Sequence, residues 1–237
     1  MASFYGTAKN DVFRFSSHTA ADTIYGDGLE DHLGTPGNNR IQAGSGGDTI
    51  YAGYGQDTVF GGAGDDLIMG YGAGGLSSGN VDGLASQDGA DRLHGGAGQD
   101  VIQGGGGGDI IFGDDGDDWL YGGSGNDTLS GGTGNDVIES GRGADTMSGG
   151  AGRDIFVFGY GYLSEFGGDA NEGRDTLLDF RPGVDRIDLS GYAVNADGVQ
   201  TTATTDGLLL TFNAIYETGE IKLVGVHQLQ AGDIVFA

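Results

Sequence analysis

The chain has 237 residues, of which 53 are glycine, 2 are proline and none is cysteine. Its 35 acidic residues against 10 basic ones give a formal charge of -25 at pH 7, which argues against nucleic acid and anionic membrane surfaces as partners. The absence of cysteine excludes disulfides, thiolate metal sites and thiol nucleophiles. No run of 18 apolar residues occurs and the N-terminus has no apolar core, so we expect neither a membrane span nor a classical signal peptide.

A unit of nine residues recurs about eleven times between residues 43 and 157, with Gly at its fourth place and Asp at its sixth. Residues 61–69 and 122–130 show it clearly, because each has a glycine-rich turn, an Asp and then a short stretch with an aliphatic residue in its middle. The strict period distinguishes this composition from aperiodic Gly-rich disorder. A fixed period this short predicts a solenoid of stacked repeats.

Residues 1–42 keep the Asp and the apolar place of the unit but lose most of its glycines. The retained pairs are Asp11 with Phe13, Asp22 with Ile24, Asp31 with Leu33, and Asn39 with Ile41. Terminal repeats of a solenoid are usually atypical because they cover an exposed end. We therefore predict an N-terminal cap of degenerate repeats over residues 1–42.

In the central array, residues 43–157, the eighth place is apolar and its flanking residues differ, which is the alternation of a half-buried strand. A three-residue strand cannot bury itself, but two repeats make a coil of 18 residues whose opposed strands press their eighth-place side chains together. We therefore predict an all-β solenoid of two thin parallel sheets packed back to back, with residues 70–85 as a loop inserted into one turn. The eighth-place residues are Ile50, Val59, Ile68, Leu93, Ile102, Ile111, Leu120, Leu129, Ile138, Met147 and Phe156.

The sixth place is Asp throughout the array. Adjacent coils of a sheet lie about 4.8 Å apart, so the carboxylates of every second repeat should form columns at that spacing. The first predicted column is Asp48, Asp66, Asp100, Asp118, Asp136 and Asp154. The second is Asp57, Asp91, Asp109, Asp127 and Asp145, provided that the inserted loop keeps the alternation.

These columns need a cation. Neighbouring carboxylates would repel each other by roughly 1 kcal/mol in water-like surroundings and by about 3 to 4 kcal/mol at an effective dielectric constant of about 20. A cage of about six to eight carboxylate and carbonyl oxygens suits Ca²⁺ better than octahedral Mg²⁺. Because a thin two-sheet core leaves little apolar burial to offset the chain entropy, we predict multiple bound Ca²⁺ ions and an array that is largely unfolded without them.

After residue 157 the nine-residue period stops. Residues 208–212 and 220–224 are strand-like runs, and a Thr218-Gly219 turn separates them. Residues 158–237 are therefore predicted to form a C-terminal antiparallel β cap.

The array resembles the RTX (repeats-in-toxin) family of calcium-binding β-rolls, whose nonapeptide is written G-G-x-G-x-D-x-U-x. The resemblance implies a parallel β-roll in which the eleven sixth-place Asp residues are calcium ligands. The sequence departs from the pattern at Ser86 with Gln87, at Asp114 and at Ser140, which stand at glycine places and are expected to weaken individual sites.

The C-terminal part carries a second resemblance. Residues 176–190 are similar to the segment that follows the β-roll in secreted RTX proteases and lipases, and residues 233–237 resemble a type I secretion tail, in which an acidic residue precedes apolar ones. The resemblance implies export from a Gram-negative bacterium to the extracellular space through a one-step ABC channel. The chain would pass the channel unfolded at low cytosolic calcium and fold in the higher external calcium.

Catalytic motifs are missing from the sequence. The four histidines form no H-E-x-x-H zinc motif, and neither a G-x-S-x-G elbow nor a G-K-[ST] phosphate loop occurs. Residues 70–75 fit G-x-G-x-x-G, but no helix pattern follows them, so we interpret them as loop. Carboxylate pairs for glycosidic chemistry stay an open alternative, because the acids are many and nothing singles out one pair. A hydrolase or lyase is therefore the least favoured hypothesis, and we predict a chain that is not an enzyme.

A binding role is the stronger alternative to a purely structural one. Places seven and nine of the unit should point outwards, and one predicted sheet presents an apolar, aromatic set there: Tyr51, Leu67, Met69, Val101, Trp119 and Tyr121. These rings could stack on sugars, or the strip could pack on the caps or on a partner. RTX modules of alginate epimerases bind polysaccharide, so the resemblance implies an extracellular polysaccharide- or matrix-binding module as the alternative.

Overall fold

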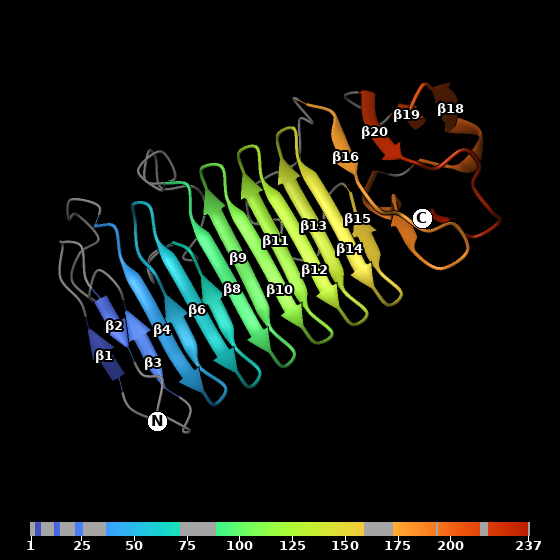
Figure 1. Ribbon diagram of the computed structural model, residues 1–237. Coiled ribbons are helices and arrows are strands. Elements are labelled where there is room, and N and C mark those ends of the chain that lie inside the picture. The colour runs from blue at the N-terminus through green and yellow to red at the C-terminus, as the bar shows by residue number, and fades with distance from the viewer. Residues whose placement is uncertain are drawn as a thin grey trace.

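The computed structural model is an elongated, two-layered stack of short strands (Figure 1). It describes residues 3–5, 12–14, 22–25, 37–71, 89–158, 173–192, 194–213 and 218–236. Among these residues the helical elements are two 3-10 helices, η1 (Ser190–Tyr192) and η2 (Ala196–Gly198). No helix in the described part of the chain is long and apolar enough to cross a membrane.

Sheet A contains ten strands among the described residues, and every neighbouring pair is parallel. In spatial order they are β1 (Ser3–Tyr5), β3 (Thr23–Tyr25), β5 (Thr49–Tyr51), β7 (Leu67–Met69), β9 (Val101–Gly106), β11 (Trp119–Ser124), β13 (Val137–Arg142), β15 (Ile155–Val157), β17 (Arg186–Asp188) and β21 (Ile234–Val235).

Sheet B contains eleven strands among the described residues. In spatial order they are β2 (Val12–Arg14), β4 (Arg40–Ser45), β6 (Thr58–Ala63), β8 (Arg92–Ala97), β10 (Ile110–Asp115), β12 (Thr128–Thr133), β14 (Thr146–Ala151), β16 (Asp175–Leu177), β20 (Thr218–Val224), β19 (Gly207–Asn213) and β18 (Val199–Thr204). Pairing is parallel from β2 to β20 and antiparallel between β20, β19 and β18.

Neighbouring strands of each sheet come from every second repeat. Trp119 of β11 pairs with Val137 of β13, eighteen residues later, as the predicted coil length requires. Across the insertion, Thr58 of β6 pairs with Arg92 of β8, so the inserted residues preserve the alternation. The predicted all-β architecture of two parallel sheets is confirmed, and the fold is a β-roll.

The core lies between the two sheets. All eleven predicted eighth-place residues are at most 1% exposed. Ile24 and Ile41 extend the core into the predicted N-terminal cap, and Phe13 packs against it. Asp11 and the predicted pair Asp31 with Leu33 lie outside the described residues. The degenerate N-terminal repeats with described strands therefore fold as coils of the same roll.

The C-terminal segment is antiparallel only in part. β16 and β17 follow the end of the nine-residue period, yet they pair in parallel with β14 and β15. Among the strands that the structure describes, antiparallel pairing is confined to β18, β19 and β20. The last strand, β21, pairs in parallel with β17, and Asp233 just before it is buried. The segment that resembles a secretion tail is therefore part of sheet A in the folded chain.

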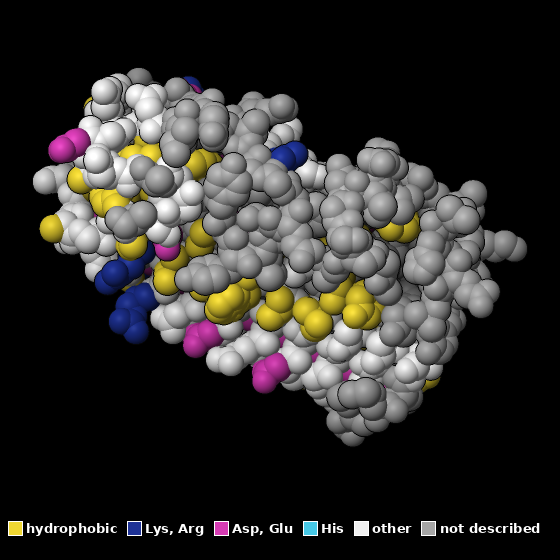
Figure 2. Space-filling view, turned by 180° about the vertical axis from the view of Figure 1, so that it is seen from behind, with side chains coloured by type: hydrophobic (Ala, Val, Ile, Leu, Met, Phe, Trp, Pro, Cys, Tyr) yellow, Lys and Arg dark blue, Asp and Glu magenta, His cyan; other side chains and the backbone are white. Residues whose placement is uncertain are grey.

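The outer face of sheet A carries a row of apolar side chains on neighbouring strands: Leu67, Val101, Trp119, Val137 and Ile155. Trp119 is 45% exposed, which makes it one of the few exposed large hydrophobic residues among those described. Met69, which we expected on this surface, is only 5% exposed. Figure 2 shows a band of hydrophobic side chains on the reverse side of the molecule.

Candidate metal sites

The loops between strands require glycine because of their backbone geometry. Gly123 and Gly125, at the second and fourth places of one unit, have φ of 110° and 144°, which residues with a β-carbon rarely adopt. A β-carbon on Gly125 would lie 1.4 Å from the carbonyl oxygen of Gly107 in the preceding coil. The glycines therefore let successive loops stack directly on each other.

This stacking brings the sixth-place residues into two columns. In each step, Oδ1 of one residue accepts a hydrogen bond from the main-chain N–H one coil earlier, as Asp100 donates to Asp118 over 2.8 Å. All eleven predicted residues are in these columns, and each is at most 2% exposed. The first column is Asp22, Asp48, Asp66, Asp100, Asp118, Asp136, Asp154 and Asp185. The second is Asn39, Asp57, Asp91, Asp109, Asp127, Asp145 and Asp175.

Asp175 and Asp185 extend the columns beyond the residues predicted from the sequence. The nine-residue spacing is lost there, but each Asp keeps a Gly two residues before it and a buried apolar residue, Leu177 or Ile187, two residues after it. This short remnant of the repeat is the signal that could have identified both residues.

The second carboxylate oxygen has no hydrogen-bond partner at several column positions. Oδ2 is buried and accepts no hydrogen bond from the described residues at Asp66, Asp100, Asp118, Asp127 and Asp136. An ionised carboxylate that is buried without compensation is costly, and the cost falls only if a cation or a proton joins it. These five oxygens therefore mark positions where positive charge is needed.

Burial raises the pKa of these carboxyls, and other nearby carboxylates add to the rise, whereas the hydrogen bond at Oδ1 opposes it. The pKa rises from the ordinary 3.8 to about 8 at Asp127 and to about 7 at Asp66 and Asp136. At Asp100 and Asp118 the pKa rises to about 6. Without a cation, the columns would take up protons close to neutral pH.

These carboxylates lie close to the first-place glycine of their own loop and to a carbonyl oxygen of the next coil. A β-carbon on Gly131, a first-place glycine, would lie 2.2 Å from Asp136 Oδ2 and 2.7 Å from the carbonyl oxygen of Gly149 in the next coil. Within the described residues, no three His, Cys, Asp or Glu side chains converge as a metal-ligand set, so an ion would need main-chain carbonyls as well. Carboxylate and carbonyl oxygens are the ligands that Ca²⁺ prefers.

The insertion leaves the repeat geometry intact on its N-terminal side. Ser86 and Gln87, which the sequence places at glycine positions of the Asp91 repeat, lie outside the described residues. Gly70 instead provides a first-place glycine, because a β-carbon there would lie 2.3 Å from Asp91 Oδ2.

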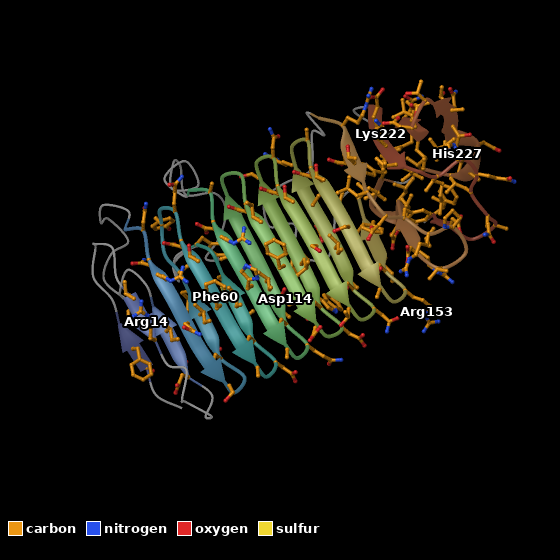
Figure 3. All side chains as sticks on the ribbon, in the orientation of Figure 1. Arg14, Phe60, Asp114, Arg153, Lys222 and His227 are labelled. Atoms are coloured by element: carbon orange, nitrogen blue, oxygen red, sulfur yellow. The ribbon has the colours of Figure 1, made fainter. Side chains whose placement is uncertain are left out.

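The other two departures alter single loops. Asp114 stands at a second place with φ of 73°, the one positive φ of a non-glycine residue in the described part of the chain. Its Oδ2 lies 3.1 Å from Nδ1 of His94 on β8, and Figure 3 labels Asp114 on this part of the stack. Ser140 stands at a first place and is 2% exposed. It has a β-carbon at a place where most loops have glycine, as Ala43 and Ala52 also do.

The fold and these loops define a class of protein: a parallel β-roll whose glycine loops bring carboxylate and carbonyl oxygens of successive coils close together. Residues 33–68, 86–120 and 121–156 match the family model of the RTX calcium-binding nonapeptide repeat (four copies). The repeat array of this chain belongs to that RTX calcium-binding family.

Two solved structures are similar to the chain. The AlgE6R2 subunit of the Azotobacter vinelandii mannuronan C5-epimerase is 26% identical, with 63% of this chain and 89% of that chain covered and a TM-score of 0.37. The AlgE6R3 subunit of the same epimerase is 33% identical, with coverages of 69% and 85% and a TM-score of 0.28. No curated protein matches the chain.

Proposed function

We propose that this chain is a secreted calcium-binding β-roll that folds when it binds several Ca²⁺ ions outside the cell, and that it acts as a structural or binding module without a catalytic role. The observation that carries the proposal is the set of buried Oδ2 atoms that accept no hydrogen bond, at Asp66, Asp100, Asp118, Asp127 and Asp136. The eleven sixth-place Asp residues and the carbonyl groups of the adjacent glycine loops would hold the ions.

Binding and folding would be coupled in such an array. The carboxylate of one coil and a carbonyl oxygen of the next come close together only when successive coils are stacked. Binding free energy is then folding free energy. Extracellular calcium modules typically bind with dissociation constants of about 10⁻⁴ to 10⁻³ M, a range that would leave the array empty at low cytosolic calcium.

Export before folding fits the position of the C-terminal residues. Asp233 is buried, with Oδ1 accepting from Gly183 N at 2.7 Å and Oδ2 from Gln230 N at 2.6 Å, and the strand after it is paired with β17. A tail held in this way would be accessible to a type I secretion channel only while the chain is unfolded. This supports, as part of the proposal, a chain that is exported unfolded and folds in external calcium.

The test is a calorimetric Ca²⁺ titration with parallel far-UV circular dichroism, starting from protein in EGTA. We expect several ions to bind and the strand signal to rise with the same calcium dependence, while Mg²⁺ at equal concentration gives a much smaller change. A spectrum in EGTA that is already rich in strand and unchanged by Ca²⁺ would contradict the coupling. Absence of a binding heat at millimolar Ca²⁺ would contradict the metal assignment itself.

A second candidate function is binding of extracellular polysaccharide. It is favoured by Trp119, which is 45% exposed in an apolar row on sheet A, because exposed aromatic rings stack on sugar faces. A glycan array probed in the presence and absence of Ca²⁺ tests it. Trp119→Ala should abolish binding, and Ile110→Ala, a change at an exposed apolar residue on sheet B, should not. Binding that is independent of Trp119, or no glycan binding at all, would favour the purely structural module.

A further inference from the structure

The first column of carboxylates ends at a loop of a different kind. Residues 181–185 form a tight turn in which Val184 N donates to Arg181 O over 3.1 Å. Pro182 and Gly183, with φ of 80° at the glycine, occupy the central positions as a type II turn requires. The turn places Asp185 as the last member of the column, where its Oδ1 accepts from Asp154 N over 3.2 Å.

The same turn directs the guanidinium group of Arg181 into the final step of the column. Its Nη2 donates to Gly152 O over 2.7 Å, to Asp154 Oδ2 over 3.1 Å and to Asp185 Oδ1 over 2.8 Å. Its Nε donates to Asp185 Oδ2 over 3.1 Å. The group therefore contacts one fourth-place carbonyl oxygen and two successive column carboxylates.

Arg181 contacts a carboxylate oxygen whose equivalent in the inner steps of the column accepts no hydrogen bond within the described part of the chain. Oδ2 of Asp136, one step before Asp154, is buried and accepts no hydrogen bond from the described residues. Oδ2 of Asp154 is the equivalent atom, and there the partner is a guanidinium, which stays charged at every relevant pH. The side chains of Asp154 and Asp185 are at most 1% exposed, whereas that of Arg181 is 40% exposed, so the contacts are buried on the side of the carboxylates.

We propose that Arg181 is a built-in cation that replaces Ca²⁺ at the last step of the first column and holds the end of the roll together without metal. The inference rests on the proposed function for the inner steps. It assigns the step between Asp154 and Asp185 to a side chain of the protein, and it makes the C-terminal coils the part of the roll that is ordered before calcium binds.

A second side chain completes this end of the roll in the same metal-independent manner. The carboxylate of Asp179 accepts hydrogen bonds from Gly149 N over 2.9 Å and from Gly150 N over 2.8 Å. The last glycine loop of the array therefore has its N–H groups bonded by one side chain and its Asp154 carboxylate bonded by another. A loop with these protein partners has less need of an ion.

The first test counts ions by native mass spectrometry of the full chain at saturating Ca²⁺. Arg181→Ala should bind one Ca²⁺ more than the natural chain, because the vacated step regains two carboxylates and a carbonyl oxygen for the metal. Arg181→Lys keeps the charge and should keep the natural count. Arg153→Ala is the matched control, because Arg153 is an exposed residue at the edge of the stack (Figure 3) and its main-chain N–H, which the change keeps, bonds Asn135. An unchanged count in Arg181→Ala would overturn the proposal.

The second test needs no variant. Hydrogen exchange of the natural chain in EGTA should show protected amides at Thr176, Arg186 and Ile187 and fast exchange at those of the inner repeats, such as Trp119 and Val137. Equal exchange throughout would overturn the proposal. If no variant binds any Ca²⁺, the proposed function fails, and the exchange profile still decides whether this end of the roll is ordered without metal.

Discussion

The inner repeats and the C-terminal end of the roll have the same core but different polar contacts. Ile138 in the array and Ile187 at the end are both fully buried between the sheets. Asp136 leaves Oδ2 buried without a hydrogen bond from the described residues, whereas both oxygens of Asp185 accept bonds from Arg181. Apolar packing therefore does not distinguish the two regions, and the source of positive charge does.

The two regions therefore differ in what stabilises them. In the inner repeats, the buried carboxylates cost free energy until a cation binds to them. Whether these repeats are folded therefore depends on the calcium concentration of the solution. The end carries its own cation on a turn fixed by Pro182 and Gly183. A roll built in this way can respond to calcium over most of its length and still keep one end as a template for stacking.

The largest effect is expected from placing a β-carbon against one inner carboxylate. In Gly131→Ala the new β-carbon would lie 2.2 Å from Asp136 Oδ2 and 2.7 Å from Gly149 O, so the carboxylate must move and the proposed ion loses a ligand. We expect one Ca²⁺ fewer and a loss of about 2 to 3 kcal/mol in calcium-loaded stability. Native mass spectrometry and thermal unfolding in Ca²⁺ measure both quantities.

The control is Gly108→Ala. Gly108 stands at a fifth place, where other repeats have alanine (Ala90, Ala144), and a β-carbon there would approach only Asn126 O, at 3.2 Å. The ion count should stay unchanged. Equal losses in both variants would mean that the glycine is needed for loop stacking and not for the position of the Asp136 carboxylate.

The next prediction compares how far the two regions depend on calcium. Asp136→Asn keeps the shape of the side chain but removes one charge of the column. We expect weaker calcium binding by about 2 kcal/mol, or roughly thirtyfold in calcium concentration, together with a more stable metal-free state, because carboxylate repulsion is relieved. Asp185→Asn removes a partner of Arg181, so it should destabilise the chain equally with and without Ca²⁺. Calcium titrations followed by circular dichroism compare them.

Asp117→Asn is the control for this pair, because Asp117 is a neighbouring exposed residue whose Oδ1 accepts from Asn135 N over 2.7 Å and would still do so as Asn. Its calcium midpoint should stay close to that of the natural chain. A calcium-dependent effect of Asp185→Asn as large as that of Asp136→Asn would remove the distinction between the two regions.

The array could be predicted from the sequence because its repeat is regular. Where the repeat is lost, the sequence no longer identified the residues of the columns. Each eighth-place side chain and each sixth-place Asp has the same neighbours one coil away, so one unit predicts the burial of Ile102 or Asp118 as well as any other. Asp175 and Asp185 were missed because their loops have lost most of the glycines. The role of Arg181 depends on a contact with Gly152, 29 residues away, which no local pattern contains.

A smaller effect concerns pH, and its sign differs between the metal-free and the loaded array. Folding raises the pKa of Asp127 from 3.8 to about 8 and that of Asp100 to about 6. Protonation therefore stabilises the metal-free fold fully below about pH 4, and this contribution is lost as the pH rises through 6 to 8. Calcium needs ionised carboxylates, so its affinity should fall on acidification, by up to about tenfold per pH unit for each proton displaced.

Circular dichroism in EGTA and calorimetric Ca²⁺ titrations at pH 5, 6, 7 and 8 measure the two trends. The strand signal without metal should grow as the pH is lowered, while calcium affinity declines. The contacts of Arg181 should respond much less over this range, because the guanidinium keeps its charge. Calcium affinity that is constant between pH 6 and 8 would contradict the need for proton release.

The smallest effect should come from restoring glycine to the loop of Asp145. At first-place glycines of the array, a β-carbon would lie 2.2 to 2.6 Å from the Asp Oδ2 of the same loop, and Ser140 has a β-carbon and a hydroxyl at this place. Ser140→Gly should tighten calcium binding at this loop by about tenfold, which corresponds to about 1.4 kcal/mol, and should lower metal-free stability by about 0.5 to 1 kcal/mol through the added chain entropy.

Ser130→Gly, a change on β12 at an outward-facing ninth place, should show the entropic loss alone. If Ser140→Gly leaves calcium binding unchanged, the space beside Asp145 is not a metal site, and the second column binds fewer ions than its carboxylates suggest.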